Sequence, residues 1–158
     1  MREDVAFGPI HMGVPDHELH HRVERALAAV GMSGFERRVP HHLSLGQRKR
    51  ISVATVLAMD PSVLVFDEPT AGLDPEERVR FRQLLSDLAG DRIILFSTHI
   101  VSDVEATASR IVLMNQGRLL RDATPSALIS GLKGKVWELE AMPEQLGAYK
   151  QKFRVTAS

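Results

Sequence analysis

Three short runs of apolar residues, each followed at once by polar residues, constrain the fold of this 158-residue chain more than any other feature. The runs occupy positions 63–66, 93–96 and 111–114. Uninterrupted apolar runs of this length are typical of strands that are buried on both faces, as in a parallel sheet. They predict an α/β fold with a mostly parallel sheet in the rear part of the chain.

A well-marked helix is expected between the first two runs. Asp74 can cap its start, and Pro75 suits its first position because that position needs no backbone N–H. Its apolar residues recur on one stripe of a helix: Phe81, Leu84, Leu85 and Leu88. The two runs and the helix between them predict one β-α-β unit.

The front third is predicted to be mainly helical. Helices are expected over about 16–30 and 45–58, where apolar residues recur at helical spacing. The first dozen residues contain Gly8 and Pro9 and are expected to be irregular. The front of the chain therefore differs in class from the strand-rich part that follows.

Turn and cap residues predict the elements after the third run. Asn115-Gln116-Gly117 predicts a hairpin into 118–122, and Thr124-Pro125 predicts a short helix that ends near Gly131. A further strand is expected over 135–140.

Charge and residue types exclude several classes of protein. Twenty Lys and Arg residues balance twenty Asp and Glu residues, so no strong field points to nucleic acid or to an anionic membrane surface. The absence of cysteine excludes a disulfide scaffold and thiolate metal sites. The longest largely apolar stretch, 51–59, is far shorter than the roughly 20 residues that span a bilayer, so a partner would have to supply any membrane span.

Two polar pairs follow the first two apolar runs: Asp67-Glu68 and Thr98-His99. In an open α/β sheet, ligands bind beyond the carboxyl ends of the strands. Asp67 can hold Mg²⁺, Glu68 can orient or deprotonate a water, and His99 can contact a phosphate. The alternative is that these residues only cap or solvate the strand ends. Taken alone, Asp67-Glu68 leaves both interpretations open, whereas for His99 alone the structural interpretation is favoured.

Other polar residues on the front helices also have two interpretations. Ser44 and Gln47 stand at a helix start, which favours an anion, but their spacing fits a capping box that needs no ligand, and alone the capping box is favoured. His17 and His21, with His20 nearby, can bind a metal in principle, but an exposed helix face is favoured. Residues 48–50 are interpreted as a solvated helix surface or an anchor near a dimer interface.

Four segments, taken in order, are far more specific together than any one of them is alone. They are His42-Leu43-Ser44-Leu45-Gly46-Gln47-Arg48, Leu64-Val65-Phe66-Asp67-Glu68-Pro69-Thr70, Ala71-Gly72-Leu73-Asp74-Pro75 and Ser97-Thr98-His99. In this order they resemble the motifs of the ATP-binding cassette (ABC) ATPases, the motor subunits of membrane transporters. The resemblance extends from about Glu3 to the region of Trp137.

The resemblance implies roles for three residues around ATP. Asp67 matches the Walker B aspartate near Mg²⁺, and Glu68 matches the catalytic glutamate that polarises the hydrolytic water. His99 matches the switch histidine near the γ-phosphate. An ATPase that uses ATP and Mg²⁺ is therefore expected.

The resemblance also implies that the active site is shared between two chains. Three residues match the signature loop, which in the family contacts the ATP held by the opposite subunit: Ser44, Gly46 and Gln47. Asp74 matches the loop that crosses the dimer interface. Leu45 stands where the family has glycine, and its bulk is expected to weaken the contact across the dimer.

The main departure from the family is that no Gly-x-x-x-x-Gly-Lys-Ser/Thr sequence occurs in the chain. A partial P-loop NTPase fold without the N-terminal P-loop lobe is therefore expected. Its parts would be a partial helical subdomain at 1–60, the remaining catalytic lobe at 61–132 and the start of a C-terminal extension at 133–158. Alone, this chain is expected to bind ATP poorly and to be inactive, with a sheet edge and an apolar face left uncovered.

Within the family, the front section, from Glu3 to about Met59, resembles energy-coupling-factor and cobalt importer ATPases. The rear section, from Asp91 to Glu138, resembles antibiotic-resistance-type exporter ATPases, which predicts a mosaic joined near 67–75. The expected function is ATP hydrolysis that energises transport, at the cytoplasmic face of the membrane. The expected partners are a transmembrane subunit and a second ATPase subunit, without nucleic acid.

Two alternatives stay open at this point. The first is a non-catalytic remnant that docks on the membrane subunit of a transporter. The second is a non-transport ABC ATPase of DNA repair or translation, which the neutral charge and the importer-like opening disfavour.

Overall fold

The structure is a computed structural model that describes residues 1–137, 140, 142–153 and 155. Its contacts divide the chain into two compact units, called unit 1 (Met1–Ser109) and unit 2 (Arg110–Ser158). Unit 1 contains α1 (Arg2–His11), α2 (Asp16–Ala29), η1 (Pro40–His42), α3 (Leu45–Leu57), β1 (Val63–Asp67), α4 (Pro75–Leu88), β2 (Ile93–Ser97) and α5 (Val101–Thr107). Unit 2 contains β3 (Ile111–Asn115), β4 (Arg118–Ala123), α6 (Pro125–Ser130), η2 (Pro143–Gln145) and α7 (Leu146–Lys152). The predicted three-part division, with boundaries after residues 60 and 132, stays a prediction.

Helix α1 shows that the prediction of an irregular opening was wrong. Gly8 and Pro9 both lie inside this helix, and Pro9 is buried together with Val5 and Ala6. A Cβ added to Gly8 would lie 2.5 Å from Met59 Sδ, so the glycine allows α1 to approach the end of α3 closely. Packing of the buried face therefore overrides the local preference of glycine and proline against a helix.

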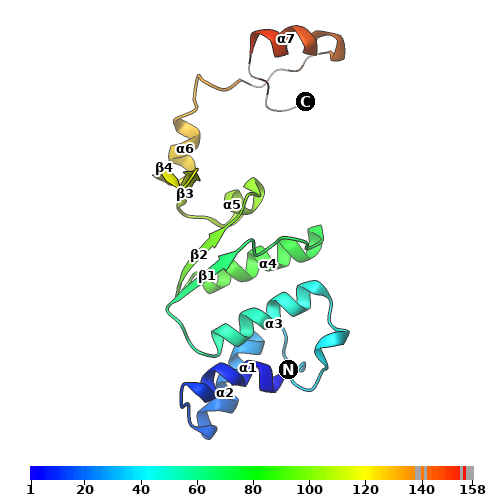
Figure 1. Ribbon diagram of the computed structural model, residues 1–158, viewed down its shortest axis with the longest axis vertical. Helices are drawn as coiled ribbons and strands as arrows, with labels where there is room; N and C mark the ends of the chain where they lie inside the picture. Colours follow the sequence, from blue (N-terminus) through cyan, green and yellow to red (C-terminus); the bar gives the residue numbers. More distant parts are fainter. Residues whose placement is uncertain (138–139, 141, 154, 156–158) are drawn as a thin grey trace. The chain divides into compact units, whose positions relative to one another are not determined.

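Helices α2 and α3 match the helices predicted over 16–30 and 45–58. Both contact α1 and each other, and Figure 1 shows the three helices grouped in the blue-to-cyan part of the chain. The main apolar side chains that they bury are Val23, Leu27, Ile51, Val53 and Leu57. The helical front third is confirmed by this arrangement.

Strands β1 and β2 pair in parallel, as the predicted β-α-β unit requires, with Leu64 opposite Ile94 and Phe66 opposite Phe96. These four side chains pack against the core, to which α4 contributes its buried stripe of Phe81, Leu84, Leu85 and Leu88. The prediction that both strand faces are buried was wrong. The described residues cover one face of the two strands only. The side chains on the other face are exposed: Val63, Val65, Ile93 and Leu95.

Unit 2 begins with the predicted hairpin, in which β3 and β4 pair antiparallel. Gln116 and Gly117 have φ of 49° and 72°, the left-handed values that a two-residue hairpin turn needs. Thr124 caps α6 through the Ala127 N–H, as the sequence predicts. The predicted strand over 135–140 is not formed by residues 135–137, and Glu138 and Leu139 lie outside the described residues.

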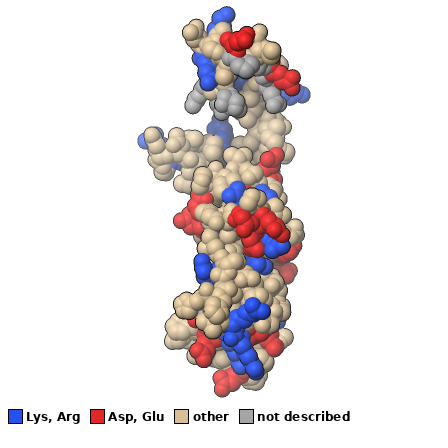
Figure 2. All heavy atoms as spheres, turned by 90° about the vertical axis from the view of Figure 1, so that its right-hand side faces the viewer, with Lys and Arg blue, Asp and Glu red and all other residues tan. Residues whose placement is uncertain are grey.

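The described part of the chain has no helix that is both long and apolar enough to cross a membrane. Figure 2 shows acidic and basic side chains close together on the face that it draws, in keeping with the balanced formal charge of the sequence.

Candidate functional site

The carboxyl ends of β1 and β2 lie side by side, because the register places Asp67 opposite Ser97. The residues that follow each strand, Glu68 on one and Thr98-His99 on the other, therefore meet at one edge of the sheet. This is the edge at which the sequence predicts a ligand site.

Glu68 and His99 contact each other directly although 31 residues separate them. His99 Nδ1 donates to Glu68 Oε1 at 2.7 Å, and the His99 backbone N–H donates to the same oxygen at 3.2 Å. Thr98 Oγ1 donates to Glu68 Oε2 at 3.3 Å. The carboxylate of Glu68 is thus oriented by three donors from the loop after β2.

The backbone of Glu68 lies in the left-handed region, with φ of 44°. Its N–H donates to the Ser97 carbonyl at 3.0 Å, which continues the pairing of the two strands by one residue. A non-glycine residue in this region costs roughly 1–3 kcal/mol and persists where surrounding contacts hold it. The strand therefore turns sharply at the residue that carries the carboxylate.

The hydrogen bond from His99 is the main reason that the pKa of the Glu68 carboxyl lies below its ordinary value. The attraction of the His99 charge and the hydrogen bond from Thr98 act in the same direction, while desolvation opposes them. Glu68 is therefore ionised at neutral pH and serves as a hydrogen-bond acceptor.

Asp67 lies beside Glu68 and accepts a hydrogen bond from Ser97 Oγ. Carboxylate and hydroxyl oxygens are ligands that Mg²⁺ prefers. Across the described residues, no three His, Cys, Asp or Glu side chains gather as a metal site. The carboxylate of Asp67 fits Mg²⁺ by its oxygen chemistry, and this ion usually takes most of its ligands from water and substrate oxygens.

The segment of Ser44, Gly46 and Gln47 forms a separate group at the start of α3. Ser44 Oγ accepts from the Gln47 N–H at 3.1 Å, and the Ser44 N–H donates to Gln47 Oε1 at 3.0 Å. This is the capping box that the spacing predicts. Gly46 is buried, and a Cβ at this position would lie 2.2 Å from Glu77 Oε2.

Asp74 lies near this group because its helix, α4, packs against α3. Its carboxylate caps α4 by accepting from the Glu77 N–H at 2.8 Å. Leu45 lies over the loop that precedes α4, because a Cβ added to Gly72 in that loop would be 3.4 Å from Leu45 Cδ2. The residues matched to the signature loop and to the interface loop are therefore neighbours, joined by Glu77.

Lys49 links the two groups through contacts that the sequence did not predict. Its ammonium donates to the carbonyl oxygens of Pro69 at 2.9 Å and Ala71 at 2.8 Å, and lies 3.5 Å from that of Glu68. Arg50 pairs with Glu77 at 3.5 Å. Of the two interpretations of residues 48–50, a solvated surface was thus wrong for Lys49 and Arg50, and an anchor near a dimer interface stays a prediction. No local signal marks these partners, because the three carbonyls lie 19 to 22 residues further along the chain.

A second missed group fixes the loop after β1 to α5. Thr70 and Asp103 are both buried, and Thr70 Oγ1 donates to Asp103 Oδ2. Arg82 lies 3.4 Å from the other carboxylate oxygen of Asp103. A buried carboxylate needs such partners, and they tie the segment after His99 to the loop after Glu68.

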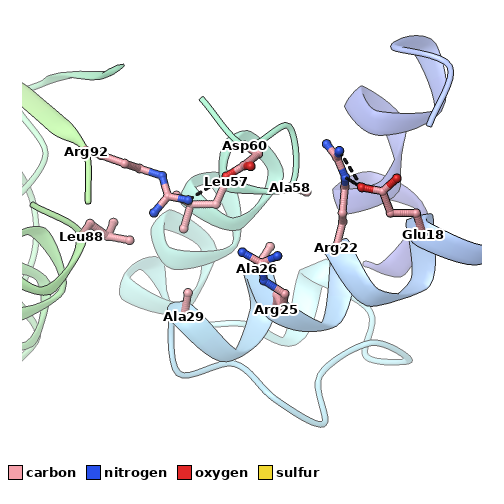
Figure 3. A pocket seen from close by; sticks show the side chains of 10 residues that line it. All are labelled: Glu18, Arg22, Arg25, Ala26, Ala29, Leu57, Ala58, Asp60, Leu88 and Arg92. Atoms are coloured by element: carbon pink, nitrogen blue, oxygen red, sulfur yellow. Dashed lines mark hydrogen bonds and ion pairs between the residues drawn. The ribbon is translucent and has the colours of Figure 1, made fainter. Parts of the chain in front are cut away.

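A pocket of about 150 Å³ lies elsewhere in unit 1, between α2 and the ends of α3 and α4 (Figure 3). Two of its arginines are paired with carboxylates: Arg22 with Glu18 at 2.7 Å and Arg92 with Asp60 at 2.9 Å. None of the candidate residues lines it. His17 and His21, considered above for a metal, are exposed on α2.

Residues 2–71 match the family described as "ABC transporter". The chain is 47% identical over 134 residues to the energy-coupling factor transporter ATP-binding protein EcfA of Methanocaldococcus jannaschii, which covers 84% of this chain and 48% of the relative. It is 45% identical over 126 residues to the EcfA protein of Methanothermobacter thermautotrophicus, covering 79% of this chain and 40% of that relative. The chain thus spans about half the length of the curated relatives that it matches.

Solved structures agree with these relatives. CbiO1 from Clostridium perfringens, described as part of the ABC transporter complex cbiONQ, has a TM-score of 0.74 at 29% identity and covers 93% of this chain and 59% of that chain. A putative metal-chelate type ABC transporter in an inward-facing conformation has a TM-score of 0.67 at 26% identity and covers 73% of this chain and 46% of that chain. The EcfA alignments extend across the 67–75 block, and the predicted join of two subfamilies there stays a prediction.

Proposed function

Because this chain belongs to the ATPase family of ABC transporters, we propose that it forms the Walker B, signature and switch-histidine part of a subunit whose ATP hydrolysis energises transport across a membrane. The observation that carries this proposal is the contact between Glu68 and His99 at the carboxyl ends of β1 and β2. A structural cap at a strand end would not require a carboxylate held by three donors on a left-handed backbone.

Glu68 is proposed as the catalytic glutamate. Its carboxylate is ionised and held in place by His99, so it can accept a hydrogen bond from a water and orient that water for attack on a phosphate. His99 is proposed to contact the γ-phosphate with its exposed ring while its Nδ1 stays on Glu68.

Asp67 is proposed to hold Mg²⁺, which would neutralise charge on the phosphates when it is bound. The carboxylate of Asp67 and the hydroxyl of Ser97 supply the oxygen chemistry that fits this ion. Asp67 and Glu68 would thus divide two tasks: one carboxylate for the metal and the next for the water.

Ser44, Gly46, Gln47 and Asp74 are proposed to face a second ATPase subunit. The start of α3 offers backbone N–H groups to an anion, and the absence of a side chain at Gly46 keeps the first turn tightly packed on α4. These 158 residues contain no P-loop sequence, so we propose that by themselves they bind ATP weakly and do not hydrolyse it.

The membrane partner is proposed to dock between α1 and α3. A hollow there is lined by two carboxylates (Glu3 and Asp4), two large apolar side chains (Phe7 and Met59), Gly8 and Thr55. Phe7 is 64% exposed although it is aromatic, which favours a contact surface. A subunit docked there would hold the chain at the cytoplasmic face of the membrane.

Equilibrium binding of labelled ATP with Mg²⁺ tests the proposal, first to the purified chain and then to its mixture with an EcfA-type subunit that has its own P-loop. We expect no micromolar binding by the chain alone, and tighter binding of ATP by the mixture than by the EcfA-type subunit alone. A Leu45→Trp variant, which enlarges an exposed side chain at the signature segment, should remove the effect on the mixture.

Each outcome has a distinct meaning. Micromolar binding by the chain alone, lost in Asp67→Ala, would show that a P-loop is not needed and would overturn the proposed inactivity. No effect on the mixture, with the chain folded and still bound to a membrane subunit, would favour the non-catalytic docking function instead.

A further inference from the structure

Lys49 is the one side chain that contacts the backbone on both sides of Thr70 from a different element of the fold, as far as the described residues show. It projects from the second turn of α3 onto the loop that carries Glu68. Its two short hydrogen bonds, at 2.9 Å to Pro69 and 2.8 Å to Ala71, bracket the turn of that loop. A flexible ammonium with three donors is suited to carbonyls that point to one place.

The contact is distinct from an ordinary surface lysine. Lys49 is partly buried, and desolvation lowers its pKa although the nearby Glu68 charge raises it. Its bonded partners are carbonyl oxygens, so it orients backbone and leaves the Glu68 carboxylate to His99 and Thr98. The left-handed backbone at Glu68 needs surrounding contacts that hold it, and Lys49 supplies one of them.

We propose that Lys49 is a positioning residue: by binding the backbone of the loop after β1, it holds Glu68 in the orientation in which its carboxylate meets His99. Since Lys49 lies on the helix that begins with the signature segment, a shift of α3 would be passed to Glu68 through this contact. The claim that Lys49 orients Glu68 is independent of the proposed function. The claim that this orientation serves ATP hydrolysis rests on the proposed function.

Nuclear magnetic resonance of the labelled chain tests the proposal without nucleotide, so its result is independent of whether the chain binds ATP. Lys49→Met keeps the length of the side chain and removes its donors. We expect the carbonyl ¹³C signals of Pro69 and Ala71 to shift, and the His99 amide, which donates to Glu68, to exchange with solvent severalfold faster.

Two matched variants make the test specific. Arg48→Met removes a carbonyl contact made by the neighbouring residue of α3, at 3.0 Å to Leu43, and should leave the His99 amide unchanged. Lys49→Arg keeps a donor at the same position and should restore most of the slow exchange. If Lys49→Met does not fold, Lys49→Gln, which keeps one donor group, is measured in its place and should show a smaller change of the same kind.

Two results would overturn the proposal. If the Pro69 and Ala71 carbonyl signals shift while the Glu68 and His99 signals stay, Lys49 is a structural tie without influence on the site. If Arg48→Met accelerates exchange at His99 as much as Lys49→Met does, the effect belongs to the helix and not to Lys49.

Discussion

Unit 1 contains every buried side chain among the described residues, whereas the described part of unit 2 contains none. In unit 1, the helices and the sheet share one apolar core, and polar contacts such as those of Lys49 join segments distant in sequence. In unit 2, the hairpin and the following helix depend on a turn, a cap and one ion pair. Packing between distant segments thus specifies the structure of unit 1, whereas interactions between near neighbours in sequence specify that of unit 2.

The largest expected difference between the units comes from removing an apolar side chain. Leu27→Ala empties a site that is 0% exposed, and we expect it to lower the free energy of unfolding by about 2–5 kcal/mol. Leu120→Ala, at a position that is 46% exposed, should change it by less than about 0.5 kcal/mol. Urea unfolding followed by circular dichroism measures both, and equal losses would break the contrast.

A smaller effect is expected from adding a methyl group at a glycine. Gly46→Ala would place a Cβ 2.2 Å from Glu77 Oε2, so Glu77 must leave its partners, and we expect a loss of about 1–3 kcal/mol. Gly147→Ala in α7 meets no atom within 4 Å and should raise helix stability by about 0.5–1 kcal/mol. Thermal unfolding of both variants measures the difference in stability between a methyl group added at a crowded glycine and one added at an open glycine.

Removal of a helix cap should also affect stability differently in the two units. Asp74→Ala removes the cap of α4, which carries part of the core, and should cost about 0.5–2 kcal/mol in global unfolding. Thr124→Ala removes the cap of α6, which buries no residue, so only the local helix signal of 125–130 should weaken. Global destabilisation by Thr124→Ala, measured by urea unfolding, would contradict this difference.

The smallest effects are expected from pH. The folded pKa of Glu68 is lowered by His99 and that of Asp122 by Arg110, so each pair adds stability that is complete above the ordinary carboxyl pKa of about 4 and is lost as the pH falls through the lowered value. In Glu68→Gln, the free energy of unfolding of unit 1 should therefore decrease less as the pH falls. In Asp122→Asn, the smaller decrease should appear only in hairpin signals, and added salt should weaken both effects because the pairs are exposed.

The sequence predicted those features that depend on neighbouring residues. The capping box of Ser44 and Gln47, the cap of Asp74, the hairpin turn and the site edge at Glu68 and His99 all follow from residue types at short spacing or at strand ends. These signals act within a few residues, so they are readable along the chain.

The features that could not be predicted depend on segments distant in sequence. Pro9 lies inside a helix because α1 packs on its neighbours, and Lys49 contacts carbonyls far along the chain. The exposed face of the strand, around Val65, is as apolar as the buried face, so no pattern in the strand distinguishes the two faces. Helix α5, which begins at Val101, was also absent from the prediction.

The left-handed backbone of Glu68 also bears on how this position can evolve. Glycine and asparagine adopt a φ near 44° more readily than glutamate does, so a change to either is expected to relieve strain in the folded chain. The strain favours such a change, and the hydrogen bonds that the Glu68 carboxylate accepts from Thr98 and His99 oppose it. Glu68 is therefore a residue at which drift toward a less strained backbone would erase the proposed chemistry.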